Sequence, residues 1–437
     1  PMIPMNQMLL YIIIMNKMIT VNPIQSSKAS YVVTNKINKE LMMITTAMID
    51  KKTNSDDIGT TSVSKVGIMN LQIINNEQDV GMAAITINEN SDPSVRVDLM
   101  RAIDELRFVS PTSLIKQSIC VPINRGRTVL GVWQGLYFMD FNEDLRDRTN
   151  AKDIAVTAMY TTTTTTNNNN QQQQQQQQKE QEQCTKSFLA PRRGFHDAHE
   201  CVETALDISN IKYGLMNVLI KHTSASLTIN DPKYATELEK ELNELIPERW
   251  NDEFLLHTME GRDDCPAHIK ATLVGETMNV PIKDGKLLLL SEDDRMMICE
   301  HRNVGGYTNG FKRDFVTTAV HGIDQKICTI ENKGNKIFNV SDIIREFVQN
   351  NNKEIKIVHV FAPNGGVFIS RIEDAHAFYE RVVTKITSKA LRKSIVGATE
   401  MLTCCDGTVE FGGMSAFVVI DSESRTTTTT EFVLTGL

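Results

Sequence analysis

Cysteine is sparse in this sequence: it has 8 cysteines among 437 residues, and only Cys404 and Cys405 are adjacent. No CxxC pair occurs. This scarcity excludes a disulfide scaffold and favours a reducing compartment, so we expect a cytoplasmic protein.

Long apolar runs and an excess of basic residues are also missing. The one candidate membrane segment, Leu9–Met15, is far shorter than the roughly 18 apolar residues needed to span a bilayer. Residues 1–50 contain no arginine, which disfavours a mitochondrial presequence. The net charge of −8 gives no long-range attraction to phosphate backbones or anionic lipid. We therefore expect neither nucleic acid nor membrane as a partner, and we interpret residues 1–35 as an unstructured leader.

A homopolymeric block interrupts the middle of the sequence. Six threonines, four asparagines and eight glutamines follow one another over 161–178. Such a block has no apolar face to bury, so we predict a low-complexity linker over 161–183. A shorter threonine run at 426–430 is expected in a loop before the last strand.

One phrase is repeated three times along the chain. VPINRGRTVLGVWQGLYFMDF (121–141) and VPIKDGKLLLLSEDDRMMICEH (280–301) share V-P-I-x-x-G-[RK], and MLTCCDGTVEFGGMSAFVVIDS (401–422) has the same outline. Each phrase begins as a strand, turns at a glycine and returns, which is typical of a β-hairpin. Upstream of each hairpin the sequence predicts strand, loop, strand and helix, over 66–106, 212–246 and 354–386.

These repeats predict an α+β protein of three units, each with about two helices. We place the units at 36–160, 184–325 and 326–437, with a further helix candidate in each at 39–49, 200–208 and 341–350. Each strand alternates apolar and polar residues, so each sheet has a face to cover. Three like units in one chain can cover one another around a pseudo-threefold axis. Three separate beads on a string are the alternative, since a long linker permits both arrangements.

Ionisable residues with spacing that suggests chemistry are concentrated in the second unit. His222 lies in KHTSAS, and His257, Glu260, Asp264 and His268 lie in HTMEGRDDCPAHIK. Imidazoles and carboxylates bind divalent metals and also act as acids and bases near neutral pH. The sequence thus predicts a metal or catalytic site here, with a hydrogen-bonded structural loop as the alternative.

Other polar residues are candidates for ligand binding. Hydroxyls and backbone N–H groups at Thr223 and Ser224 could hold an anion, or simply close a turn. Arg302 could bind a phosphate in a bidentate manner, or belong to a solvated charge cluster. In the first unit Trp133 and Gln134 lie in GVWQGLYF, where packing is the simpler interpretation of a tryptophan.

A further polar cluster, in the first unit, lies at the start of a helix predicted at DPSV. It contains Glu89, Asn90 and Asp92, and helix capping explains these residues without any function.

The ordered phrases of the second unit resemble the YjbQ-like family. They are RRGFHDAHECV, GLMNVLIKHTSASLTIND, HTMEGRDDCPAHIKATLVGETMNVPIKDGKL, CEHR and RDFVTTAVHG, and they cover about 186–322. The first unit is similar to the same family through ITINENSDP and GVWQGLYF, and the third only through its order of elements. The resemblance implies a two-sheet α+β fold for each unit and a homotrimeric assembly. This chain resembles such a trimer written as one polypeptide, a monomeric pseudo-trimer.

The resemblance also implies a site near the subunit boundaries, with bound metal and a weak thiamine-phosphate synthase activity in the family. The second unit keeps the histidines but has Glu292, Asp293 and Asp294 where the family has Trp-Gln-Gly. The first unit keeps Trp-Gln-Gly but lacks the histidine loop. Because these losses are complementary, we expect one composite site between the first two units.

The resulting hypothesis is a metal-dependent enzyme that acts on a small phosphorylated substrate, and the alternative is a non-catalytic pseudoenzyme that serves as a binding or structural module. His222, His257 and His268 would hold a divalent metal, zinc in the first instance, or act as acid–base groups. Glu260 and Asp264 would support them, and the substrate would contact Thr223, Ser224, Arg302, Trp133, Gln134 and Glu89.

Overall fold

The described residues of the first unit form two antiparallel sheets and two helices. The computed structural model describes residues 24–31, 62–74, 83–108, 111–125, 127–141, 152–165, 182–303, 310–332, 336–351, 354–420 and 428–437. The elements of unit 1 are β1 (Ile24–Tyr31), β2 (Ser62–Ile74), β3 (Ala83–Glu89), α2 (Ser94–Leu106), α3 (Pro111–Leu114), β4 (Ser118–Asn124), β5 (Arg127–Thr128), β6 (Gln134–Asp140) and β7 (Lys152–Thr165). Its sheets have the orders β1-β7-β2-β4-β5 and β3-β6.

The second unit repeats this arrangement with additional short elements. They are β8 (Gln183–Ala190), β9 (Gly194–Asp197), α5 (His199–Glu203), β10 (Tyr213–Ile220), β11 (Ala225–Asn230), η1 (Pro232–Tyr234), α6 (Ala235–Leu245), α7 (Trp250–Glu253), α8 (Asp264–Val274), β12 (Thr277–Lys283), β13 (Lys286–Leu287), β14 (Arg295–Glu300) and β15 (Phe311–His321). The sheets have the orders β8-β15-β10-β12-β13 and β11-β14-β9.

The third unit has the same topology again. Its elements are β16 (Asp324–Asn332), β17 (Ile337–Asn339), α9 (Ser341–Asn350), β18 (Ile357–Phe361), β19 (Val367–Ser370), α10 (Ile372–Lys385), α11 (Lys389–Val396), β20 (Thr399–Cys405), β21 (Thr408–Val409), β22 (Ser415–Val419) and β23 (Thr428–Gly436). The sheets have the orders β16-β23-β18-β20-β21 and β17-β22-β19. The α+β class and the repeated two-sheet unit are thus confirmed.

The predicted hairpins occur where the glycines lie. Asp284 and Gly285 join β12 to β13 with φ of 48° and 77°, and Asp406 and Gly407 join β20 to β21 with φ of 49° and 78°. Two successive residues with positive φ form a turn whose twist matches that of paired strands, and Asp-Gly is a preferred sequence for it. Each return strand has only two residues, and the chain then continues into the smaller sheet.

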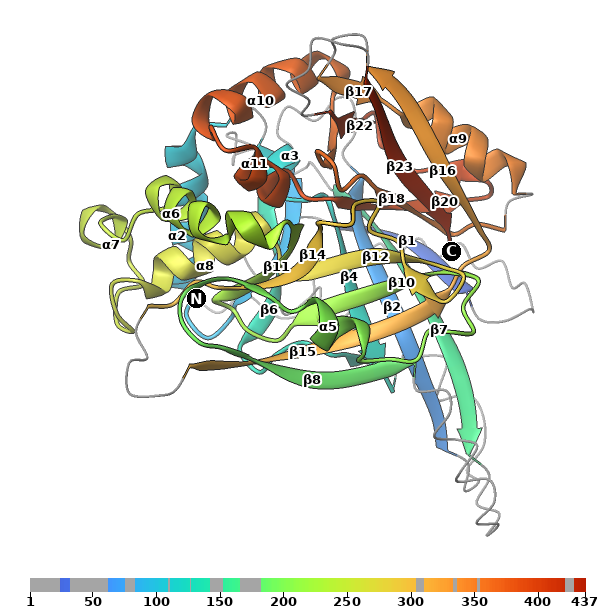
Figure 1. Cartoon of the computed structure of the whole chain (residues 1–437), viewed down its shortest axis with the longest axis horizontal. Coiled ribbons are helices and arrows are strands. Elements are labelled where there is room, and N and C mark those ends of the chain that lie inside the picture. The colour runs from blue at the N-terminus through green and yellow to red at the C-terminus, as the bar shows by residue number, and fades with distance from the viewer. Residues whose placement is uncertain are drawn as a thin grey trace, which may run out of the picture.

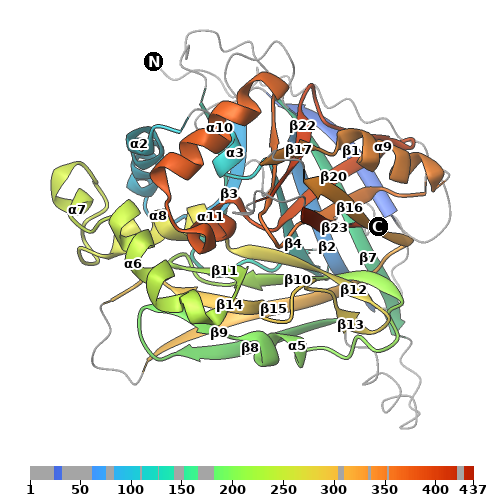
Figure 2. The same ribbon diagram turned by 45° about the horizontal axis from the view of Figure 1, so that its top comes forward.

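The three units share one core and are not beads on a string. Helices α2, α6, α8, α10 and α11 gather on one side of the molecule (Figures 1 and 2). Beneath them a single cluster of buried side chains takes Leu99 from unit 1, Leu238 from unit 2 and Phe378 from unit 3. A second cluster joins Ile68, Leu215 and Ile357 from the corresponding strands β2, β10 and β18.

Both threonine runs contribute to strands, contrary to the sequence prediction. In β7 the residues 161–165 pair with 62–66 of β2, so the predicted linker cannot begin at 161. In β23 the residues 428–430 pair with β16. β-branched threonine favours extended backbone, and here a partner strand supplies the hydrogen bonds. Residues 166–181 of the predicted linker lie outside the described residues.

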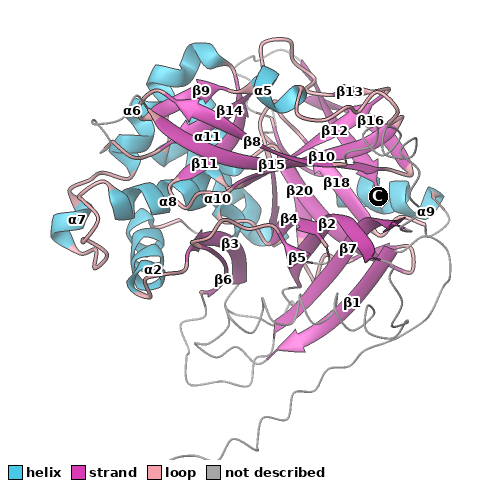
Figure 3. Cartoon of the chain, turned by 90° about the horizontal axis from the view of Figure 1, so that it is seen from below, coloured by secondary structure: helices cyan, strands magenta, loops and turns pink. Residues whose placement is uncertain are grey.

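Two other predicted boundaries also shift. The leader predicted over 1–35 contains β1, which pairs with β7 at the edge of the first sheet (Figure 3). The third unit begins with β16 at Asp324 instead of residue 326. The helix predicted over 341–350 is α9, α5 is shorter than predicted, and 39–49 lies outside the described residues. Within the described part of the chain, no helix has the length and apolar character to cross a membrane.

Candidate metal centre

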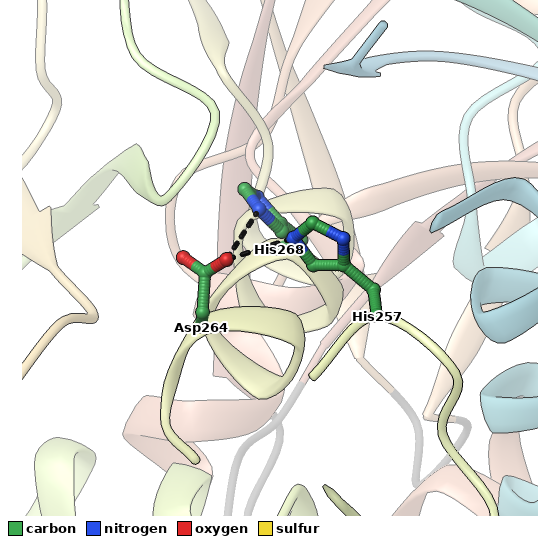
Figure 4. Close-up of side chains that lie close together, drawn as sticks. All are labelled: His257, Asp264 and His268. Atoms are coloured by element: carbon green, nitrogen blue, oxygen red, sulfur yellow. Dashed lines mark hydrogen bonds and ion pairs between the residues drawn. The ribbon is translucent and has the colours of Figure 1, made fainter. Parts of the chain in front are cut away.

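Two imidazoles and one carboxylate meet at the junction of units 1 and 2. His257 lies in the loop before α8, and Asp264 and His268 lie one turn apart on that helix (Figure 4). The Asp264 Oδ2 atom lies 2.8 Å from His257 Nε2 and 3.6 Å from His268 Nε2. One potential ligand atom from each residue lies within 4.8 Å of the others, and all three side chains are buried.

The other nitrogen of each imidazole has an acceptor of its own. His257 Nδ1 lies 2.6 Å from Asp92 Oδ2, and His268 Nδ1 lies 2.9 Å from the carbonyl oxygen of Thr223. Each Nδ1 thus faces an acceptor outside the group of three, and each Nε2 faces the Asp264 carboxylate, where a bound ion would take the place of a proton. Such carboxylate and carbonyl partners are typical of histidines that bind metal through Nε2. The donor set is therefore of the kind that could hold a divalent cation such as zinc.

The surroundings of His268 and Asp92 favour the unprotonated forms of these side chains, which a metal site needs. Burial lowers the pKa of His268, although the Thr223 carbonyl opposes this shift. The hydrogen bond from His257 is the largest cause that lowers the pKa of Asp92 to about 2. Near neutral pH, Asp92 is thus a carboxylate, and the His268 Nε2 lone pair is available.

Side chains of unit 1 form hydrogen bonds to helix α8 and to the loops around the site in unit 2. Asn88 donates to the His268 carbonyl at 3.0 Å and to Thr272 Oγ1 at 2.5 Å. Gln134 donates to the carbonyls of Ile220 and His222 at 2.9 and 3.1 Å. Asp98 Oδ2 accepts the backbone N–H groups of Leu256 and His257, each at 2.8 Å. Residues of both units therefore build the junction.

His222 lies apart from the group of three. Its Nδ1 is 3.2 Å from an Arg313 nitrogen, and Arg313 forms an ion pair with Glu300. Burial first, and the Arg313 charge second, lower the pKa of His222 to about 4. The structure thus replaces His222 with Asp264 in the set that could hold a metal.

Arg302 also has a different position from the one predicted. Its guanidinium pairs with Asp264 and with Asp263, and it donates to the Glu260 carbonyl at 2.7 Å. All three guanidinium nitrogens therefore have protein acceptors, because the flanking acidic residues fold back onto the arginine. Arg302 orients the Asp264 carboxylate, and the Glu260 side chain is exposed.

The remaining predicted residues contribute in different ways. Thr223 acts through its carbonyl, and the Ser224 carbonyl accepts the His301 N–H. Glu89 is buried, accepts the Ser91 N–H at 2.8 Å and acts on His268 through its charge. Trp133 is 63% exposed, so it is not a core residue.

Sequence reasoning missed the second role of Asp92. Its Oδ1 accepts the Ser94 N–H at 2.8 Å, at the first residue of α2, although Pro93 is the N-cap of this helix. The Oδ2 atom of the same carboxylate binds His257. The sequence contains no signal for this second bond, because 165 residues separate the two partners.

The alignment of units 1 and 2 at the hairpin must also shift by one residue. Asn88 pairs with Gly135 in unit 1, and Asn230 pairs with Arg295 in unit 2. The counterparts of Trp133, Gln134 and Gly135 are therefore Asp293, Asp294 and Arg295.

Comparison with known proteins agrees with this architecture. The family described as UPF0047 protein YjbQ-like matches residues 60–161 and 185–321, together more than half of the chain. The chain belongs to this family, whose function is uncharacterised. The UPF0047 protein YjbQ of Escherichia coli O157:H7 is 34% identical over 128 residues, which are 28% of this chain and 90% of that protein. The YjbQ protein of Salmonella typhimurium is 34% identical over 118 residues, 26% of this chain and 83% of that protein.

Solved structures give matches of similar extent. A YbjQ-like protein of unknown function from Sulfolobus solfataricus is 17% identical and has a TM-score of 0.27, covering 31% of this chain and 95% of that one. A conserved hypothetical protein from Thermus thermophilus is 25% identical with a TM-score of 0.26, covering 31% and 98%. The family matches fall on units 1 and 2, and unit 3 shares their strand order.

Proposed function

We propose that this chain is a metal-dependent enzyme that binds one divalent ion, zinc, at the junction of units 1 and 2. The observation that carries the proposal is the orientation of the two imidazoles. Both have Nδ1 bonded to an acceptor and Nε2 directed at Asp264 Oδ2. His257, His268 and Asp264 would hold the ion, which when bound would supply Lewis-acid activation of a substrate oxygen or of water.

The residues around these ligands keep them in place. Asp92 accepts the proton of His257 Nδ1 and so fixes the orientation of the ring. Arg302 binds Asp264 Oδ1 and leaves Oδ2 for the ion. Burial of all three ligands excludes water from their far sides, which strengthens each electrostatic contact.

The proposed substrate is a small phosphorylated molecule, as the family resemblance implies. Arg302 does not support this part of the proposal, because its nitrogens are bound to protein acceptors. A phosphoryl group would need another cation at the junction.

A second candidate function is a non-catalytic module. One observation favours it: units 2 and 3 are in contact although Ala390 takes the place that His268 has in the first junction. There Lys393 Nζ lies 2.6 Å from Asp294 Oδ1. Units can thus remain associated after the histidines are lost. We also propose that the chain is a monomer, since three units already pack together, and light scattering coupled to size exclusion tests this.

Elemental analysis of the purified full chain separates the two functions. We expect about one zinc per chain in the wild type, and loss of zinc in His257→Ala and His268→Ala. His376→Ala is the matched control, because His376 is exposed on α10 of unit 3. A folded wild type without metal, even after incubation with zinc, supports the module instead.

The contribution of unit 1 is tested by Asp92→Ala. Loss of a carboxylate that supports a metal-binding histidine typically weakens metal binding by about 10- to 100-fold. Asp104→Ala, an exposed position on α2, should leave the affinity unchanged. Equal zinc affinity in both variants would mean that the Asp92 carboxylate does not support the site.

A further inference from the structure

A cavity of about 80 Å³ lies where the three units meet. Residues of three corresponding segments line it, 116–120, 275–279 and 397–401, and each segment leads from a helix into strand β4, β12 or β20. By the same measure a buried water needs at least about 10–15 Å³, so the cavity has room for a molecule of about five or six non-hydrogen atoms. The three candidate metal ligands are not among its lining residues, so the cavity is a separate place in the molecule.

Three of the described lining residues are charged: Lys116, Glu276 and Glu400. The Lys116 Nζ atom lies 3.3 Å from Glu400 Oε2 and donates to the carbonyls of Val367 and Val396 at 2.8 and 2.6 Å. These three contacts use all three N–H groups of the ammonium. The Lys116 charge is therefore committed to Glu400, and the lining keeps one further acidic group.

That group, Glu276, has no cation beside it in the described part of the chain. The residue is 2% exposed, and no described residue donates to its Oε1 atom. Burial raises the pKa of the Glu276 carboxyl well above its usual range, and a hydrogen bond with its own backbone is the only opposing cause. Because a buried carboxylate is stable only with a partner of opposite charge, Glu276 calls for a cation.

Two helices end at this cavity, and only one of them has a cation there. Helix α11 ends at Val396, whose carbonyl accepts the Lys116 ammonium. Helix α8 ends at Val274, which lines the cavity with Gly275 and Glu276. The C-terminus of a helix carries partial negative charge and favours a cation. Lys116 is the one basic side chain among the described lining residues, so the end of α8 is also a favourable place for a bound cation.

The remaining lining combines hydroxyl groups with aliphatic side chains. Thr277 and Thr399 are the first residues of β12 and β20, and both are half-buried. Leu227 and Ile229 of β11 line the same cavity. Hydroxyl oxygens accept hydrogen bonds from an ammonium, and the aliphatic side chains favour an alkyl chain. This combination suits a ligand with one charged end and one apolar end.

We propose that this cavity binds a small aliphatic amine in its protonated form, with Glu276 as the counter-ion. The ammonium group takes the place at the end of α8 that Lys116 takes at the end of α11. The hydroxyls of Thr277 and Thr399 supply further acceptors, and the alkyl chain packs against Leu227 and Ile229. This inference goes beyond the proposed function, because it uses none of the metal ligands.

Titration calorimetry of the full chain with n-butylamine, which has five non-hydrogen atoms and is protonated near neutral pH, tests the inference. We expect n-butanol, the neutral molecule of the same size, to bind at least about tenfold more weakly. Glu276→Gln should weaken n-butylamine binding by about tenfold or more, because it removes the charge and keeps the shape. Glu373→Gln, at an exposed position on α10, is the matched control and should bind as the wild type does.

A second variant tests the location of the ligand. Ala398 lines the cavity and is half-buried, so Ala398→Leu fills part of the space and should also weaken n-butylamine binding by about tenfold or more. Gln117 occupies in unit 1 the position of Glu276, so the fold accepts a glutamine in this place.

Three results would overturn the inference: no binding of n-butylamine by the wild type, equal binding of n-butanol, or wild-type affinity in folded Glu276→Gln or Ala398→Leu. Affinities measured with and without zinc should agree, since the cavity is separate from the metal centre. A chain that binds no zinc but binds n-butylamine through Glu276 would contradict the metal proposal and support the amine site.

Discussion

The junction of units 1 and 2 and the junction of units 2 and 3 share one pattern of asparagine hydrogen bonds, which we call the frame. They differ in the ionisable side chains around it. In the first, Asn88 donates to the His268 carbonyl and to the Thr272 hydroxyl. In the second, Asn230 donates to the Ala390 carbonyl at 2.8 Å and to the Ser394 hydroxyl at 3.0 Å. In both, one asparagine at the end of a strand bonds two positions one turn apart on a helix of the next unit.

The chemistry differs at the positions around that frame. His268 of the first junction is replaced by Ala390 in the second, so the imidazole is absent there. Gln134 corresponds to Asp294, which pairs with Lys393. A lysine ammonium thus supplies positive charge at this junction. The asparagine hydrogen bonds are thus common to both interfaces. The candidate metal-binding groups are not, so an interface can form without them.

The largest expected effect on stability is that of Lys393→Met. Both partners of the ion pair are buried, with side-chain exposures of 11% for Lys393 and 5% for Asp294. Removing the lysine leaves a buried carboxylate unpaired, which typically costs about 3–5 kcal/mol of unfolding free energy. Urea denaturation measures the change, and Lys389→Met, an exposed position on the same helix, is the control. A loss no larger than that of the control would mean that the pair does not stabilise the second junction.

Asn88→Ala and Asn230→Ala form a matched pair with the next largest effect. Each removes two hydrogen bonds to the neighbouring unit, so we expect each to lower the unfolding free energy by about 1–3 kcal/mol. Urea denaturation should give similar values for the two variants. A large loss for one and none for the other would show that the two junctions do not share a frame.

His359 allows a smaller test of how imidazoles differ between regions. It lies in β18 at the position of Asn70 and Asn217 in the other units, and burial lowers its pKa to about 3. The unfolded chain binds this proton near pH 6.5 and the folded chain does not. The free energy of unfolding therefore has its full value above pH 6.5 and decreases as the pH falls toward 3. The slope from this one group is about 1.4 kcal/mol per pH unit.

Unfolding of His359→Asn by urea at a series of pH values measures this slope. The variant should lack about that part of the acid destabilisation, whereas His376→Asn should retain it. An unchanged pH dependence in His359→Asn would mean that the imidazole is not buried in its neutral form.

The smallest effect is expected for Trp133→Ala. An indole that is 63% exposed contributes little packing, so we expect a change in unfolding free energy within about 0.5 kcal/mol. The zinc content should also remain that of the wild type, because the Gln134 amide and the Asn88 amide hold the junction. Loss of zinc in this variant would place the tryptophan in the site itself.

The sequence predicted the repeated topology because its signals are local. Glycines 285 and 407 lie at hairpin turns where positive φ is needed, and helix α9 has the bounds that its apolar spacing predicts. The threonine strand in β7 was not predicted, because its partner residues 62–66 lie about a hundred positions earlier in the chain. Strand formation there depends on a neighbour that composition does not reveal.

Part of the candidate site was also accessible from the sequence. The complementary losses in units 1 and 2 predicted that residues of both would be needed, and the structure places Asp92 and Asn88 beside His257 and His268. The sequence did not predict the partners of the His222 ring and the Arg302 guanidinium. A long side chain can reach several charged groups, and only the fold determines which of them lies nearest.

Anomalous X-ray diffraction at the zinc absorption edge, from crystals of the full chain, tests the central claim most directly. We predict one peak per chain, bounded by the Nε2 atoms of His257 and His268 and by Asp264 Oδ2. Protein prepared with zinc that gives no peak at this position, or that gives its peak beside Lys393 at the second junction, would contradict the account.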